Sequence, residues 1–145
     1  MKIFILLLFL YQLSLITAED QLLFDFSLLC HIPNRSWNYN IEIWEIDNFF
    51  HDFVTKTEGH SEFAEKNLKM RGYKNGDLSP EYEFRMTISH NCNHDGSWKT
   101  VTMDFPDGIE VFHTWYILNF HYDITDKSES FKNTAIRVYY QRWLK

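Results

Sequence analysis

Apolar side chains recur at every second position through several short stretches of this chain, and this period restricts the fold more than any other feature. In the stretch 82–90, Tyr82, Phe84, Met86 and Ile88 alternate with charged or hydroxylated residues. A period of two is typical of strands that bury one face against a core. On this pattern we predict strands at 22–30, 39–44, 52–57, 61–65, 82–90, 101–105 and 118–122.

The longest interruption of this pattern is 66–80, where Gly72, Asn75-Gly76 and Pro80 favour turns. We predict a long loop there, with room for one helical turn. Just before it, the predicted strand 61–65 is expected to point Phe63 inward. Short strands with almost no helix signal indicate an all-β fold, and their spacing favours an antiparallel immunoglobulin-like β-sandwich.

The first 18 residues have the three parts of a secretory signal peptide. Lys2 supplies the positive charge, 3–10 is an unbroken apolar run, and Ala18 is a small residue at the cleavage position. An uncleaved membrane anchor is the alternative, but the run is shorter than the ~20 apolar residues of a spanning helix. We therefore expect export, a single domain at 19–123, a C-terminal extension at 124–145 and no transmembrane segment.

The charge of the chain limits its partners. The net charge is −6, and the acidic excess lies in 19–122, whereas basic residues predominate in 123–145. Binding to nucleic acid depends on cations that contact phosphates. An acidic body therefore argues against a nucleic-acid partner.

Two cysteines, Cys30 and Cys92, fall in the part expected to be exported. In an oxidising compartment an even pair is most simply one disulfide. Asn34-Arg35-Ser36 is a sequon for N-glycosylation, and it lies in a predicted turn. Export would make glycosylation of Asn34 possible, although such sequons also arise by chance.

The order of several motifs resembles the nematode transthyretin-like family of secreted proteins. The shared features are the strand that ends at Cys30, the alternating stretch 39–47 and the strand end His90-Asn91-Cys92, together with Thr55, Thr57, Phe63 and 118–120. The resemblance covers 24–122. It implies the transthyretin (prealbumin-like) fold, which is an immunoglobulin-like sandwich.

The chain departs from that family in ways that mark a divergent member. Phe84 stands where many relatives have proline, and the later cysteines of the family are absent. The enzymatic branch of the superfamily, the hydroxyisourate hydrolases, ends in a Tyr-Arg-Gly-Ser signature, whereas 140–145 reads YQRWLK. We expect no catalytic residues and no cofactor.

His90, Cys92 and His94 have a spacing that could also be interpreted as a zinc site. A fourth ligand is not evident, and a disulfide would remove the thiolate. The preferred interpretation is a disulfide flanked by surface histidines, with no metal site.

Two basic and aromatic groups are candidates for partner contacts. Within the predicted loop these are Lys69, Arg71, Tyr73 and Lys74, and in the tail they are Arg137, Arg142 and Trp143. The first group is either a solvated loop or a contact for an acidic partner or lipid headgroup. Because residues alternate through 135–143, the tail is predicted to add an edge strand to the sandwich; the alternative is an interfacial segment.

Together these features predict a secreted, non-catalytic binding or adaptor protein that recognises a cell-surface, lipid-headgroup or host partner. The alternative is a carrier of a small hydrophobic ligand, which the aromatic content of 18% favours. The two functions predict different structures for the domain. A closed core with exposed aromatic loops would support the adaptor, and an apolar pocket would support the carrier.

Overall fold

The computed structural model describes residues 20–47, 50–74, 81–105, 108–110, 115–128, 131–132 and 137–141. The predicted signal peptide and the predicted contact residues Arg142 and Trp143 lie outside these ranges. Every regular element within them is a strand. Among the described residues, no helix is long and apolar enough to cross a membrane.

Eleven strands follow one another along the described part of the chain. They are β1 (Asp20–Leu29), β2 (Trp37–Ile46), β3 (His51–Ser61), β4 (Glu65–Lys74), β5 (Glu81–Tyr82), β6 (Phe84–His90), β7 (Lys99–Asp104), β8 (Ile109–Glu110), β9 (Trp115–Asp123), β10 (Phe131–Lys132) and β11 (Arg137–Gln141).

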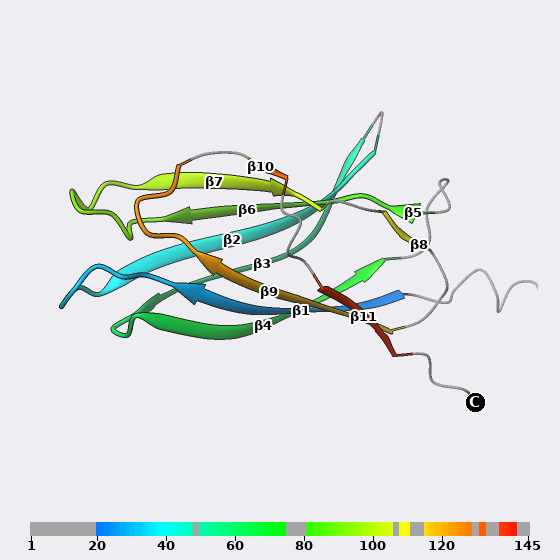
Figure 1. Cartoon of the computed structure of the whole chain (residues 1–145). Coiled ribbons are helices and arrows are strands. Elements are labelled where there is room, and N and C mark those ends of the chain that lie inside the picture. The colour runs from blue at the N-terminus through cyan, green and yellow to red at the C-terminus, as the bar shows by residue number, and fades with distance from the viewer. Residues whose placement is uncertain are drawn as a thin grey trace, which may run out of the picture.

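Two sheets pack face to face, in the orders β11-β9-β1-β4 and β10-β7-β6-β2-β3, and β5 pairs with β8 in a small third sheet (Figure 1). The predicted all-β sandwich is confirmed. Most neighbouring strands are antiparallel, but β1 pairs with β9 in parallel, and so does β10 with β7. The prediction of an antiparallel sandwich therefore holds for most of the strand pairs but not for these two.

The core forms between the inward rows of the two sheets, as the period of two predicts. In the first sheet Leu22, Phe24 and Phe26 are buried, and the rings of Phe26 and Phe120 stack with centroids 4.7 Å apart. The second sheet buries Ile41, Ile43, Met86, Ile88, Val101 and Met103 against them. Full burial of each large apolar side chain contributes about 1.5–3 kcal/mol to folding.

The predicted loop at 66–80 was wrong over its described part, because 66–74 belongs to β4 and pairs with β1 along its whole length. Gly72 had suggested a turn. It is instead an inward-facing strand residue, and a Cβ there would collide with the side chain of Val54 on β3. The absence of a side chain at Gly72 lets β3 approach β4 closely. Glycine can occur inside a strand for this purpose as well as in turns.

The predicted strand at 61–65 and the inward position of Phe63 were also wrong. Residues 62–64 form the turn between β3 and β4, and Phe63 is 75% exposed. The turn is stabilised by Ser61, whose hydroxyl donates to the Phe63 carbonyl at 3.1 Å and accepts from the Phe63 amide at 3.2 Å. These local bonds satisfy the backbone without a sheet partner and direct the ring outward.

The tail contributes two strands to the sandwich. β11 lies at the edge of the first sheet, where it pairs antiparallel with β9 from Arg137 opposite Asn119 to Gln141 opposite Trp115. β10 pairs with β7 at the edge of the other sheet. The chain therefore returns to both sheets after β9.

Candidate functional site

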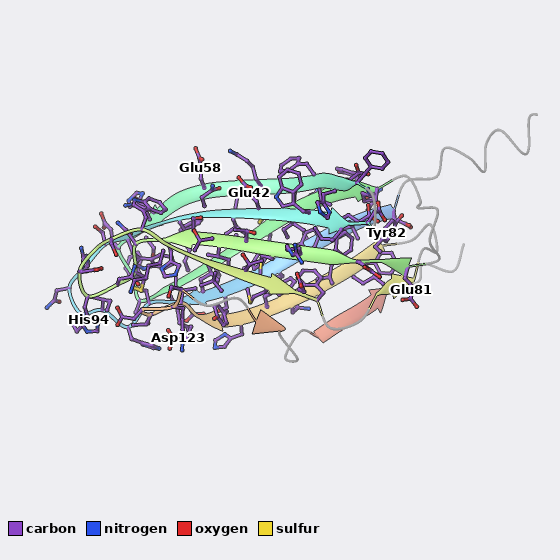
Figure 2. All side chains as sticks on the ribbon, turned by 90° about the horizontal axis from the view of Figure 1, so that it is seen from above. Glu42, Glu58, Glu81, Tyr82, His94 and Asp123 are labelled. Carbon is purple, nitrogen blue, oxygen red and sulfur yellow. A yellow bond between two sulfur atoms is a disulfide. The ribbon has the colours of Figure 1, made fainter. Side chains whose placement is uncertain are left out.

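Four connections meet at one end of the sandwich, on the left in Figure 1. They are 30–36 between β1 and β2, 62–64 between β3 and β4, 91–98 between β6 and β7, and 124–128 after β9. We call them the loop platform. Figure 2 shows His94 and Asp123 at this end of the molecule and Glu81 and Tyr82 at the opposite end.

A disulfide joins two of the four connections. Cys30 and Cys92 are bonded, with their Cα atoms 5.9 Å apart, as the sequence predicts. A disulfide that closes a loop of this kind typically contributes about 2–4 kcal/mol. Because the sulfur of Cys92 is bonded to Cys30, it is not available as a thiolate, so the zinc interpretation of His90, Cys92 and His94 is not supported.

Backbone hydrogen bonds fasten the other two connections to the disulfide. The amide of Cys30 donates to the carbonyl of Ala64 at 2.7 Å, and the amide of Asp126 donates to the carbonyl of Cys92 at 3.0 Å. The amide of His31 also donates to the hydroxyl of Thr125 at 2.9 Å. All four connections are thus joined to one another at or beside one crosslink.

Arg35 stabilises the β6–β7 connection from across the platform. Its Nη1 donates to the carbonyl of Asn93 at 2.7 Å and to that of His94 at 3.3 Å. Gly96 lies below this guanidinium with φ at +72°, and a Cβ there would overlap it. The connection therefore needs glycine both for its backbone conformation and for the space that Arg35 occupies.

The platform displays two large aromatic side chains. Phe63 is 75% exposed and Trp98 is 58% exposed. The backbone beneath Phe63 is fixed, because the indole Nε1 of Trp37 donates to the Phe63 carbonyl at 2.9 Å. Aromatic side chains often dominate the energetics of protein interfaces, and a backbone that is already fixed reduces the entropy lost when such a ring is bound.

Charged groups surround these rings. The ring of His94 contacts the carboxylate of Asp126, and the His94 amide donates to the same carboxylate at 2.9 Å. This amide bond lowers the pKa of Asp126, with the ring contact adding to it. His31 lies 3.8 Å from Asp123. Partial burial raises the pKa of Asp123, but the hydrogen bonds from Thr125 outweigh this effect and hold the pKa below its usual value.

The sequon residue Asn34 also lies on the platform. It is exposed and has a φ of +55° in the turn between β1 and β2. Asparagine tolerates this left-handed conformation better than most residues. The side chain of Asn34 is therefore accessible at the surface of the folded protein.

The predicted contact residues of 69–74 lie away from the platform. Lys69, Arg71 and Tyr73 are exposed on the outward row of β4, because residues two apart on a strand share a face. Lys69 pairs with Asp25 at 3.3 Å. Arg71 and Tyr73 border a shallow hollow of about 40 Å³ with Gln21 and Leu23 of β1.

Lys74, the fourth residue of this predicted group, has different surroundings from the other three. Its side chain is 10% exposed and contacts Glu45, and it also lies 2.8 Å from Asp52. Burial opposes its charge, but the hydrogen bonds that its ammonium group donates to the two carboxylates raise the pKa of Lys74. Glu45, Asp47 and Asp52 are close enough to resemble a cation site. The ammonium group of Lys74 already supplies a positive charge to this cluster.

The predicted contact residues of the tail are only partly placed. Arg137 lies in β11, and its backbone pairs with Asn119. Arg142 and Trp143 lie outside the described residues. The structure thus assembles a set of surface residues that the sequence reasoning missed, chiefly Arg35, Phe63 and Trp98.

A family model described as "Caenorhabditis elegans protein of unknown function (DUF870)" matches residues 25–135, from β1 to beyond β10. The chain belongs to this family. No curated protein and no solved structure matches the chain. The matched region includes the whole loop platform, and the family carries no assigned activity from which a function could be transferred.

Proposed function

We propose that this protein is a secreted, non-catalytic binding module that contacts an extracellular partner through the loop platform. The observation that carries the proposal is the exposure of Phe63 and Trp98 on neighbouring connections, which are fastened together by the Cys30–Cys92 disulfide and by the hydrogen bond from the Cys30 amide to Ala64. Loops at one end of a rigid sandwich are a common place for recognition residues. A disulfide is also compatible with an oxidising compartment, which supports export.

The alternative function, a carrier of a small hydrophobic ligand, receives less support. Carrier pockets typically enclose about 300–1,000 Å³. The hollow between β1 and β4 has about 40 Å³ and lies on the outer face of the sheet. Aromatic rings that a pocket would need, such as Phe24, Phe26 and Phe120, instead fill the interior by packing on one another.

We further propose that the family is a divergent branch of the transthyretin-like proteins, with the signal peptide at 1–18 and a glycan at Asn34. The sandwich and the disulfide at the ends of β1 and β6 support this relationship. Intact mass spectrometry of protein secreted from animal cells tests both processing steps. Removal of 18 residues and a mass that decreases on treatment with a glycosidase are the expected results.

Binding can be tested with single-residue variants at the two ends of the sandwich. Phe63→Ser and Trp98→Ser alter the platform, and Phe53→Ser is the matched control, since Phe53 is 50% exposed near the opposite end. Each secreted variant is immobilised and incubated with extracellular fluid. We expect the native protein and Phe53→Ser to retain one discrete partner and the two platform variants to lose it.

Equal retention by all four proteins would contradict the proposed surface. Loss in Phe53→Ser alone would move the contact to the β2–β3 end. Thermal unfolding of each variant separates these results from misfolding, because truncation of an exposed ring should change stability by no more than about 0.5 kcal/mol.

A further inference from the structure

Three histidines contact the short segment 123–128 that leads from β9 to the tail strands. His31 lies 3.8 Å from the carboxylate of Asp123, and His94 contacts that of Asp126. The third, His90, lies at the end of β6, and its Nε2 is 3.0 Å from the carbonyl oxygen of Lys127. The first two rings are exposed, whereas His90 is fully buried.

The protonation state of His90 follows from its partner. A carbonyl oxygen can only accept, so Nε2 carries the proton and donates to Lys127. The other nitrogen, Nδ1, is buried without a hydrogen-bond partner among the described residues. A second proton on this ring would therefore place an N–H donor and a positive charge in a site where neither is satisfied.

The groups around His90 do not offset the free-energy cost of placing a second proton on its buried ring. On β7 its register partner is Lys99, whose charge repels an imidazolium. On β2 its register partner is Tyr39, a phenol whose pKa is raised by burial and which stays neutral in acid. In the segment, Asp126 attracts positive charge but is already in contact with His94. Burial is the main cause of the lowered pKa of His90.

We propose that His90 is an acid-sensitive latch on the segment 123–128. When the ring gains a second proton, water can hydrate it only if the segment lifts from the end of β6, which breaks the bond to Lys127 and separates Asp126 from Cys92. The latch is independent of the proposed binding function, since it requires no partner.

The two exposed histidines act in the opposite direction. Each faces a carboxylate of the segment, so a positively charged ring at either position would hold the segment in place rather than release it. Opening in acid is therefore a specific signature of His90, because the surface pairs of the other two histidines oppose opening.

The expected size of the effect follows from linkage. A histidine that is neutral when latched and has an ordinary pKa of about 6.5 when exposed makes opening more favourable by about tenfold per pH unit below that value. The increase stops once the pH reaches the lower pKa of the latched form. Above about pH 7 the opening equilibrium should not depend on pH.

Amide exchange measured by NMR between pH 7.5 and 4.5, corrected for intrinsic chemistry, tests the latch. The reporter is the amide of Asp126, which donates to Cys92, and the control is the amide of Cys30, which donates to Ala64. We expect exchange at Asp126 to accelerate below about pH 6.5, while the Cys30 amide remains protected. The midpoint should coincide with titration of the His90 ring.

His90→Gln provides the matched variant, because glutamine can donate to Lys127 and does not titrate. It should abolish the acid-dependent acceleration, whereas His94→Gln should retain it. Exchange at Asp126 that is constant or slower in acid would overturn the proposal. So would a midpoint that does not coincide with titration of the His90 ring, and the native protein alone can reveal either result if His90→Gln fails to fold.

Discussion

The indole of Trp37 donates a hydrogen bond to the backbone carbonyl of Phe63 at 2.9 Å, which joins the start of β2 to the turn between β3 and β4. Trp37 itself is 1% exposed. A core residue thus fixes the backbone of the most exposed ring on the platform. This relationship restrains the turn that carries the ring, so the point from which the Phe63 side chain projects is fixed by the core.

The disulfide should be a major contribution to stability. Replacement of both Cys30 and Cys92 by serine is expected to lower the free energy of unfolding by about 2–4 kcal/mol, because the unfolded chain regains a long open loop. Urea denaturation measures the change. Alkylation of the unreduced native protein should detect no free thiol, and two reactive thiols would contradict the account.

Gly96 should not accept a side chain. Gly96→Ala is expected to destabilise the protein by about 1–3 kcal/mol, because its φ is positive and a Cβ would overlap Arg35. The Arg35→Ala background separates the two causes. In that background Gly96→Ala should lower the free energy of unfolding only by the amount due to the positive φ. A loss of stability equal to that in the native background would argue against the overlap with Arg35.

The tail should stabilise the sandwich through β11. Truncation after Lys132 removes the five residues that pair with β9 and leaves β9 as the edge of its sheet. We expect a loss of at least about 2 kcal/mol, at about 0.5–1.5 kcal/mol for each net hydrogen bond. Thermal unfolding measures it. Unchanged stability would favour the alternative interpretation of the tail as a segment that serves a partner or a membrane.

The contact between His94 and Asp126 should appear in the acid limb of the stability curve. The pKa of Asp126 is lowered in the folded protein, so its contribution is fully present above the ordinary aspartate value of about 3.9 and is lost as the pH falls through the folded value. Asp126→Asn should therefore flatten the stability curve below about pH 4. An acid limb identical to that of the native protein would show that the contact has no effect on folding.

The alternation of apolar residues predicts the sandwich well because burial depends on which face a strand residue occupies. Leu22, Phe24, Met86 and Ile88 are all buried as predicted. The pairing of Cys30 with Cys92 is also correct, since the chain has only two cysteines.

The prediction failed where a residue type has two physical uses. Gly72 favours turns in isolation, but here it permits the close approach of β3 to β4. Phe63 suits a core in isolation, but the hydroxyl of Ser61 forms a local turn that directs it outward. Ser61 was the signal in the sequence that could have predicted this turn, because a serine hydroxyl often hydrogen-bonds to the backbone two residues further along the chain.

The platform could not be predicted because its contacts join residues far apart in the chain. Arg35 and Asn93 are 58 positions apart, and His94 and Asp126 are 32 apart. No local pattern encodes such pairs. The sequence could locate basic residues such as Arg71, but it could not show that Phe63 and Trp98 share one end of the molecule.

The central claim is that the loop platform is the surface that meets a partner. Site-specific photocrosslinking tests it most directly, with a photoreactive phenylalanine analogue placed at Phe63, Trp98, Tyr73 or Phe53, all exposed in the free protein. We expect a single crosslinked partner from positions 63 and 98 and none from 73 or 53. Crosslinks from position 73 alone would assign the contact to the outer face of β4 and contradict the account.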